Sequence, residues 1–277
     1  MAYNTSQYWI NKEQRAQVAK KHTEQMEEKF KEEIKDCIDE TYLYNTGFNM
    51  ELEKYNNRDK NADIIICDLD SVTAIFEYKD EITAVLNFSS YKNPGGMFLK
   101  GSKAQEECLC HESYLYNVLK EIPDFYSLNN QHKNKALYLN RGLYTPDVLF
   151  KREDRYVYCD VITCAAPNKT AAQKYCNVSN KENYKVLKSR IKFIIDMAVK
   201  NDVNTLILGA YGCGVFGQDP YEVAKIFKEI LDKYPKLFKT IVFAIPNKSS
   251  ENHKAFKEVF NKWLEHIQKQ YRENIPN

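Results

Sequence analysis

Two glycine-rich segments, one followed closely by a pair of glutamates, are where this 277-residue sequence most clearly suggests chemistry. The first is NPGGMFLKGSKAQEECLCHES, residues 93–113, in which adjacent glycines precede Glu106 and Glu107. The second is GAYGCGVFGQDP, residues 209–220. Glycines let backbone N–H groups approach an anion. Together the segments predict a diphosphate site with an acid/base group beside it, and a single carboxylate that first donates and then accepts a proton suits glycosidic-bond cleavage.

The glutamate pair is predicted to lie in the first turn of a helix. Ser102 and Gln105 have the S-x-x-Q form of a capping box, which predicts that the helix begins there. Adjacent helical residues point about 100° apart, so we expect one carboxylate to reach into the crevice while the other braces it or contacts a neighbouring group. Acidic residues in a first turn also suit the helix dipole, so the pair taken alone has a purely structural explanation.

The second segment contains a G-x-G-x-x-G pattern, at Gly212, Gly214 and Gly217, of the kind found in dinucleotide-binding folds. Only one more strand is expected after it, and that strand, VFAIPN, ends without the acidic residue that would hold a ribose. A Rossmann dehydrogenase is therefore disfavoured. Asp219 and Pro220 predict the N-cap and first residue of a helix, with Glu222 completing a capping box. A tight turn that merely needs glycine is the structural alternative.

The elements that must position these segments alternate between strands and helices. We expect helices at 11–40, from about 71, and at 103–120, 183–200, 220–234 and 250–271, and strands at 63–67, 82–88, 144–150, 156–164, 203–208 and 240–245. Residues 41–61 and 121–140 look irregular. This alternation predicts an α/β fold with a mostly parallel sheet in three layers and helical additions at both ends. Both glycine segments would leave carboxyl ends of strands, where such sheets bind ligands.

Composition limits the remaining possibilities. The net charge of +2 comes from 40 basic and 38 acidic residues, so no direct nucleic-acid binding is expected. No apolar run is long enough to span a membrane, and the first thirty residues are too charged for a signal peptide. Eight cysteines then indicate reduced thiols and a cytoplasmic protein. The apolar faces fit the core of a monomer, with residues 1–60 as a helical extension packed on a domain of residues 61–277.

The cysteines suggest two further hypotheses, a zinc site and a reactive thiol. Cys108, Cys110 and His111 suggest zinc, but Cys110 points away from the other two on a helix, and the sequence has no C-x-x-C or H-x-x-x-H partner. We expect neither a metal nor a cofactor. Cys213, beside an anion site, could be partly ionised. A Cys–His hydrolase would need a paired base, and no histidine lies in a comparable loop.

At these residues the sequence resembles the bacterial-type poly(ADP-ribose) glycohydrolases, which are built on a macrodomain. Their signature is G-G-G, six to eight residues, then Q-E-E. Here Gly95, Gly96 and Met97 are followed by FLKGSKA and by the intact triplet at residues 105–107. The segment GCGVFGQDP resembles the family's second diphosphate loop, including its phenylalanine at Phe216. Residues 61–277 would then form a macrodomain-like, ADP-ribose-binding catalytic domain.

The resemblance implies a role for each matching residue. Glu107 would protonate the departing ribose oxygen of poly(ADP-ribose) and then activate water, while Glu106 would orient the riboses. Phe216 would pack on the distal ribose, and glycine N–H groups of both segments would bind the diphosphate. The implied substrate-binding residues are Asn93, Gly95, Gly96, Met97, Gln105, Gly212, Cys213, Gly214, Val215, Phe216 and Gly217. The implied partner is ADP-ribose or its polymer on modified proteins.

Two alternatives stay open from the sequence. Met97 replaces the third signature glycine, and it would strain or move the loop if that position needs a positive φ or a bare backbone. The chain would then be a macrodomain that binds ADP-ribose without cleaving it. Removal of single ADP-ribose units is the other alternative. The helix dipole lowers the pKa of a first-turn carboxylate, whereas a general acid needs a raised pKa, so desolvation or neighbouring charge must prevail.

Overall fold

Short apolar runs form the strands of one mixed sheet. The computed structural model describes residues 11–261, and within them seven strands pair in the order β1-β4-β5-β3-β6-β7-β2. The strands are β1 Tyr42–Tyr44, β2 Asp63–Cys67, β3 Thr83–Phe88, β4 Gly142–Arg152, β5 Arg155–Cys164, β6 Thr205–Leu208 and β7 Thr240–Ala244. The predicted short strand at 63–67 and the hairpin joined by the charged turn at 151–155 are both confirmed.

Strand direction gathers several loops at one edge of the sheet. β5, β3, β6, β7 and β2 are parallel to one another, while β4 runs antiparallel to β5 and β1 antiparallel to β4. The carboxyl ends of β3 and β6 are therefore neighbours, and the first glycine segment follows β3 while the second follows β6. This places both predicted loops at the edge where open α/β sheets bind ligands.

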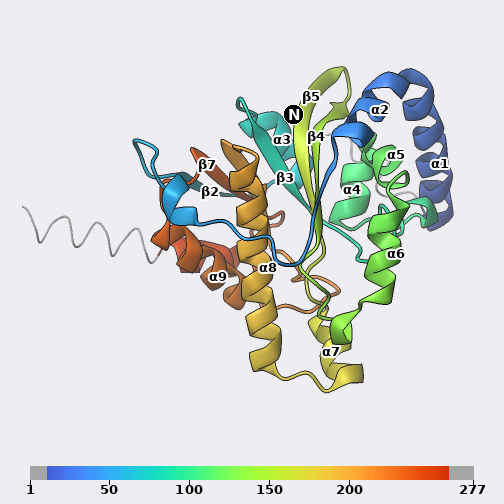
Figure 1. Ribbon diagram of the computed structural model, residues 1–277. Helices are drawn as coiled ribbons and strands as arrows, with labels where there is room; N and C mark the ends of the chain where they lie inside the picture. Colours follow the sequence, from blue (N-terminus) through green and yellow to red (C-terminus); the bar gives the residue numbers. More distant parts are fainter. Residues whose placement is uncertain (1–10, 262–277) are drawn as a thin grey trace, which may run out of the picture.

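Helices cover both faces of the sheet, as the predicted three-layer arrangement requires (Figure 1). On β3, Ala84 and Leu86 belong to the core on one face, which includes α8, α9 and the final helix, whereas Val85 belongs to the core on the other face, which includes α1 to α6. This alternation is the period of a strand buried on both sides. The α-helices are α1 Lys12–Lys29, α2 Lys31–Glu40, α3 Ser71–Tyr78, α4 Gln105–His111, α5 Leu115–Leu119, α6 Pro123–Gln131, α7 Lys169–Cys176, α8 Asn180–Lys200 and α9 Pro220–Lys233, with short 3-10 turns at η2 Leu52–Tyr55, η3 Phe98–Lys100 and η4 Asn134–Ala136.

Three predicted helices differ in the structure. The single helix expected at 11–40 is two helices, because Phe30 has a non-helical φ of −126°. The helix expected at 103–120 is divided between α4 and α5, where the backbone of Glu112 and Ser113 instead bonds to β4. The final helix is observed over residues 251–261, and its predicted continuation to 271 lies outside the described residues. The irregular segment at 41–61 contains β1, whose pairing with β4 no local pattern announces.

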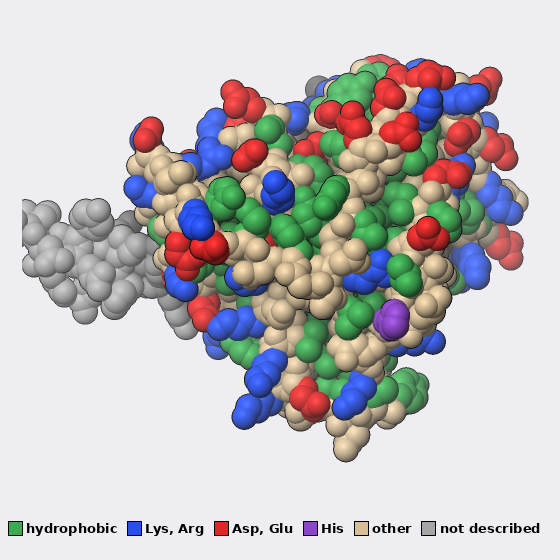
Figure 2. All heavy atoms as spheres, viewed as in Figure 1, with side chains coloured by type: hydrophobic (Ala, Val, Ile, Leu, Met, Phe, Trp, Pro, Cys, Tyr) green, Lys and Arg blue, Asp and Glu red, His purple; other side chains and the backbone are tan. Residues whose placement is uncertain are grey.

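Charge is spread unevenly over the face of the protein drawn in Figure 2. In the view of Figure 2, acidic side chains gather around α1 and α2, while lysine and arginine side chains are more prominent around α7 and the beginning of α8. The carboxyl ends of the parallel strands point toward α7, because β5 leads into it. None of the helices between residues 11 and 261 combines the length and apolar character that crossing a membrane requires.

Candidate active site

The N-terminus of helix α4 is capped by the side chain of Glu107, the third residue of the helix. The N–H of Ala104 donates to Glu107 Oε2 at 2.9 Å, so the capping box predicted from Ser102 and Gln105 is wrong. Both glutamates lie in the first turn, as expected, and both are buried, with 3% of Glu106 and 5% of Glu107 exposed. Burial of two adjacent carboxyl groups is unfavourable unless each finds specific partners.

Glu107 is held from two sides by backbone N–H groups. Besides the bond from Ala104, its Oε1 accepts a hydrogen bond from the N–H of Met97 at 2.9 Å. Met97 has a φ of −113°, a value open to any residue, and its side chain is 40% exposed. The backbone strain expected if this position needed a positive φ therefore does not arise. What this position supplies to the site is its backbone N–H.

Glu106 is the more desolvated of the two carboxyl groups. Its Oε2 accepts a hydrogen bond from the N–H of Ser90 at 2.7 Å, and its Oε1 lies 3.4 Å from Asn87 Nδ2. Burial raises the pKa of Glu106 to about 8, and the nearby charge of Glu107 adds to the rise, although the Ser90 and Asn87 hydrogen bonds oppose it. Glu106 therefore favours its protonated form at neutral pH.

Unpartnered polar atoms surround Glu106. Among the described residues, Asn87 Oδ1, Ser89 Oγ and the Tyr126 hydroxyl are buried without a hydrogen-bond partner. Asn87 and Ser89 lie at the end of β3 and just beyond it, and the pKa of Tyr126 is raised well above its usual value by burial and then by the charge of Glu106. A protein rarely leaves such groups unsatisfied. Their concentration here marks the end of β3 as a functional region.

The paired glycines bring the loop against the carboxyl groups. Gly95 and Gly96 have φ values of +61° and +60°, which favour glycine. A β-carbon on Gly95 would lie 2.7 Å from the Tyr116 ring, and one on Gly96 would meet both glutamates. The N–H of Gly96 donates to Asn93 O at 3.1 Å, so in this structure it closes a turn. The diphosphate role implied for these glycines and the ribose contact implied for Asn93 stay predictions.

Gln105 ties α4 to the end of β3. Its Oε1 accepts a hydrogen bond from the N–H of Phe88 at 2.8 Å, and its Nε2 donates to Leu86 O at 2.8 Å and to Ser71 Oγ at 3.1 Å. Both ends of the amide are thus engaged within the protein. These bonds hold the start of α4 against β3, and the substrate contact implied for Gln105 stays a prediction.

The second glycine loop lies beside the first. The rings of Phe88, which ends β3, and Tyr211 are 5.7 Å apart, and a β-carbon on Gly209 would lie 2.9 Å from the Phe88 ring. Within residues 11–261, the N–H groups of three successive residues of this loop have no acceptor. These residues are Gly214, Val215 and Phe216. Successive N–H groups free to point outward form an anion-binding concavity.

The remaining residues of this loop hold its shape. Gln218 donates its N–H to Gly212 O, and Gly217 donates to Gly214 O, both at 3.0 Å. Burial raises the pKa of the Cys213 thiol to about 12, which disfavours the thiolate and is consistent with a side chain that fills space. Val215 is 88% exposed at the loop surface.

Phe216 is half-buried and rests on aromatic side chains that the sequence did not single out. Its ring centroid is 6.2 Å from that of Tyr138, which in turn stacks on Tyr91 at 4.0 Å. Tyr91 lies between Ser90 and the paired glycines, so this stack links the two loops. Tyr91 could have been noticed in the sequence only because it directly precedes the first glycine loop, between SS and KNP. Its stacking on Tyr138 has no sequence pattern, because Tyr138 is 47 residues further along the chain.

The loop ends in the predicted helix start. Asp219 Oδ1 accepts hydrogen bonds from the N–H groups of Tyr221 at 2.7 Å and Glu222 at 3.2 Å, which confirms Asp219 as the N-cap of α9. The Glu222 carboxylate lies 3.8 Å from Lys169 Nζ, so it pairs with α7 instead of completing a capping box. Among residues 11–261, no group of three or more His, Cys, Asp or Glu side chains is arranged to hold a metal.

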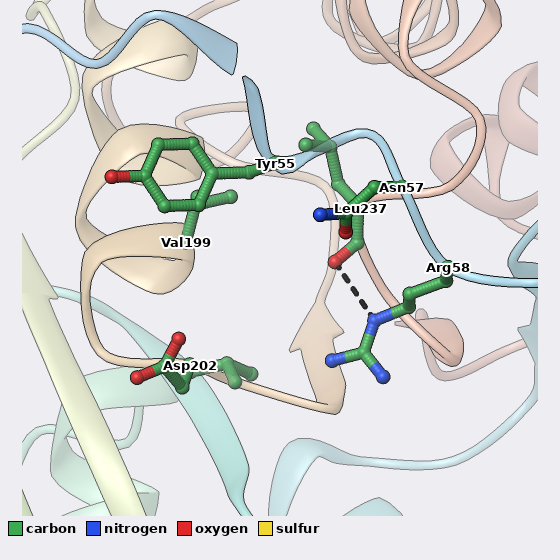
Figure 3. A pocket seen from close by; sticks show the side chains of 7 residues that line it. Tyr55, Asn57, Arg58, Val199, Asp202 and Leu237 are labelled. Carbon is green, nitrogen blue, oxygen red and sulfur yellow. Dashed lines mark hydrogen bonds between the residues drawn. The ribbon is translucent and has the colours of Figure 1, made fainter. Parts of the chain in front are cut away.

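A separate pocket lies at the opposite edge of the sheet. It has a volume of about 260 Å³ and is lined by residues that include Arg58, Val199, Asp202 and Leu237 (Figure 3). Arg58 Nε donates to Leu237 O at 3.2 Å across it. Asp202 precedes β6 and Leu237 precedes β7, whereas the glycine loops follow β3 and β6, so this pocket is remote from the glutamates.

Known structures resemble this arrangement over most of the chain. The poly(ADP-ribose) glycohydrolase of Thermomonospora curvata is 27% identical, with a TM-score of 0.79 over 90% of this chain and 100% of that one. The same enzyme bound to the inhibitor ADP-HPD matches with a TM-score of 0.76 at 27% identity, over 89% and 99% of the two chains. The Deinococcus radiodurans glycohydrolase in complex with ADP-ribose has a TM-score of 0.76 and 27% identity over 83% of this chain and 98% of that one. These likenesses confirm the predicted macrodomain-like α/β fold.

Sequence comparison gives a family. No curated protein matches the chain. The family described as "Microbial-type PARG, catalytic domain" matches residues 11–153, slightly more than half of the 277 residues, and this range includes both glutamates and the first glycine loop. The chain therefore belongs to the microbial-type poly(ADP-ribose) glycohydrolases.

Proposed function

We propose that this protein binds ADP-ribose units and hydrolyses the ribose–ribose O-glycosidic bond of poly(ADP-ribose), with Glu107 as general acid and base. The observation that carries the proposal is the buried pair of Glu106 and Glu107, placed beside two loops at the carboxyl ends of neighbouring strands. The family match supports the activity, and the ADP-ribose bound to the Deinococcus enzyme supports the ligand.

The geometry suits a diphosphate-linked sugar. The free N–H groups of residues 214–216 would bind phosphate oxygens, and Phe216 would pack on the ribose next to them. A ribose held there would reach the glutamates across the Phe88–Tyr211 contact, which joins the two loops. Burial limits the access of bulk water to the glutamates, so their proton transfers involve the substrate and the single attacking water.

The reaction needs one carboxyl group that first donates a proton and later regains one. A carboxylic acid protonates the departing ribose oxygen as the C–O bond breaks, and an oxocarbenium-like sugar forms. The carboxylate then removes a proton from water as the water oxygen attacks the sugar, which restores the acid. Because burial raises the pKa of Glu106 to about 8, that carboxyl group favours its protonated form at neutral pH, directly beside Glu107. Two backbone N–H groups fix the orientation of Glu107 throughout.

The test compares release of ADP-ribose by the parent and by Glu107→Gln. With labelled poly(ADP-ribose), we expect the variant to lose at least about 10²- to 10⁴-fold in rate, the range attributed to a general acid. Glu182→Gln is the matched control, because Glu182 also accepts the N-cap N–H of its helix, at 2.9 Å from Ser179 N, and lies in α8. The control should retain the parent rate.

The other results would separate the alternatives. ADP-ribose binding in calorimetry without release by the parent would make the protein a binding module. Release from singly modified proteins but not from the polymer would make it a mono-ADP-ribosyl hydrolase. Equal loss in Glu107→Gln and Glu182→Gln would show that helix capping, not proton transfer, explains the effect.

We further propose that the segment 1–60 and the domain 61–277 form one structural unit. From residue 11 onward, this is supported by Arg15 Nε donating to Gly101 O at 2.7 Å and by β1 extending the sheet. A cytoplasmic location fits the eight unpaired cysteines, because persistent free thiols are typical of a reducing compartment. We also propose that the enzyme is a monomer that acts on modified proteins.

A further inference from the structure

Arg190 is a fully buried cation. It lies in α8 with 0% of its surface exposed, and its guanidinium donates to Asn140 Oδ1 at 2.7 Å, to Leu137 O at 3.3 Å and to Ala165 O. Each of these acceptors is a neutral oxygen. Burying a charged guanidinium is unfavourable, and folded proteins usually offset it with a carboxylate.

Arg141 repeats this pattern at the start of β4. It is 5% exposed and donates to Asn45 Oδ1 and Asn129 Oδ1, both at 2.9 Å, and to Phe125 O at 3.4 Å. Its Nη2 is buried without a hydrogen-bond partner among the described residues. Within residues 11–261, no carboxylate lies within 4 Å of Arg141 or Arg190.

Each arginine is connected through one neighbouring residue to one of the two glycine loops. Arg141 reaches the first loop through Asn129, whose Nδ2 donates to Tyr91 O at 3.0 Å. Arg190 reaches the second loop through Ala165, whose neighbour Ala166 would touch a β-carbon on Gly212 at 2.9 Å.

The two contacts are close in the fold as well. Ala165 directly follows β5, and Cys164 at the end of that strand pairs with Gly142, the residue after Arg141. Tyr211 of the second loop also donates its hydroxyl to Cys164 O at 3.1 Å. Both positive charges therefore lie near the carboxyl end of β5, which also contacts Tyr211 of the second glycine loop.

We propose that Arg141 and Arg190 are the buried counter-charges of the substrate's diphosphate, acting through the two loops as positioning residues. This inference rests on the proposed function, which places a diphosphate between the loops. The free protein keeps two positive charges without carboxylate partners, and the bound diphosphate neutralises them across a region of low dielectric, where Coulomb attraction is strong. The loops' N–H groups make the contacts, and the arginines supply the charge.

The experiment separates charge from hydrogen bonding at each position. Arg190→Lys keeps the positive charge but loses the planar guanidinium that donates three hydrogen bonds. Arg190→Met loses both the charge and these hydrogen bonds, and its side chain has a similar length. Arg141→Lys and Arg141→Met form a second pair, which decides the question if the Arg190 variants do not fold. Calorimetry measures ADP-ribose affinity, ligand-observed NMR measures binding of the uncharged ligand adenosine, and thermal unfolding checks the free variants.

We expect each Met variant to bind ADP-ribose on the order of tenfold more weakly than its Lys partner, because it lacks one unit of positive charge near the diphosphate. Adenosine binding should be equal within each pair, and each free Met variant should unfold at no lower a temperature than its Lys partner, because Met removes a buried charge that lacks a carboxylate. Equal ADP-ribose affinity in the Lys and Met variants, or a parallel loss of adenosine binding, would overturn the proposal. Failure of the parent to bind ADP-ribose would refute the proposed function instead.

Discussion

The carboxyl groups of Glu106 and Glu107 meet at Gly96. A β-carbon on residue 96 would lie 2.9 Å from Glu106 Oε2 and 2.7 Å from Glu107 Oε1, closer than real side-chain contacts permit. The loop can therefore cover both carboxyl groups only because residue 96 has no side chain. The second glycine of the pair is thus explained by its neighbours in space, independently of any phosphate.

Gly96→Ala should inactivate the enzyme while leaving it folded. The added methyl group must push one carboxyl group away or lift the N–H of Met97 from Glu107, and displacement of a catalytic group by about 1 Å can reduce the rate about 100-fold. Gly47→Ala is the matched control, because Gly47 also has a positive φ, +103°, but nothing within 4 Å of its β-carbon. Polymer-release kinetics and urea unfolding measure both effects. Similar activity in the two variants would contradict a steric role for Gly96.

Glu106 should make stability depend on pH in a specific direction. Its folded pKa of about 8 exceeds the ordinary value of 4.5, so the folded protein binds more protons than the unfolded chain between these values. Its stabilising contribution is full below about pH 4.5 and is lost as pH rises through about 8. Relative to Glu106→Gln, the parent should lose about 1.4 kcal/mol of unfolding free energy per pH unit across this window.

Urea unfolding at several pH values between 5 and 9 provides the comparison. The difference in unfolding free energy between Glu106→Gln and the parent should grow with pH and level off above about pH 8. A difference that stays constant would mean that Glu106 ionises normally in the folded protein, which would contradict its raised pKa.

The arrangement of the elements was largely predictable from sequence, because it follows from local patterns. DIIIC and TLIL are apolar runs that match β2 and β6, and Asp219 with Pro220 marks the start of α9. Strand β1 was missed because its three residues are defined by pairing with β4, about 100 residues away. The 11–40 region was predicted as one helix because its periodic pattern continues across the break at Phe30.

At the site, the sequence predicted which residues matter better than what each one does. S-x-x-Q resembles a capping box, but the end of β3 offers Gln105 stronger partners in Phe88 N–H and Leu86 O, so Glu107 serves as the cap. Met97 looked disruptive because the signature has glycine there, yet its φ is negative. Arg141 and Arg190 belong to no motif, and only the tertiary structure shows that they are buried without carboxylates.

Gln105→Leu should weaken the fold and the chemistry together. The substitution keeps the approximate volume but leaves the N–H of Phe88 without its partner and removes a donor from the carbonyl of Leu86, and a buried unsatisfied group costs about 1–3 kcal/mol. Because Gln105 immediately precedes the glutamates, we also expect kcat to fall more than KM rises. Chemical denaturation and steady-state kinetics test this. A raised KM with normal stability would instead indicate that Gln105 contacts the substrate.

Gly101→Ala should release α1 from the rest of the protein. Gly101 has a φ of +76°, and a β-carbon there would collide with the backbone carbonyl of Lys12 at the start of α1. Backbone cannot move aside as a flexible side chain can, so the helix must shift and lose the bond from Arg15 to Gly101 O. Hydrogen exchange of the α1 amides should accelerate in this variant but not in Gly47→Ala, which shares the positive φ without the collision.

Polymer release should also slow as α1 detaches, because the turn at 97–102 positions the N–H of Met97 that donates to Glu107. Unchanged exchange in α1 would argue against a single structural unit, because it would show that the extension does not depend on its contact with the catalytic loop.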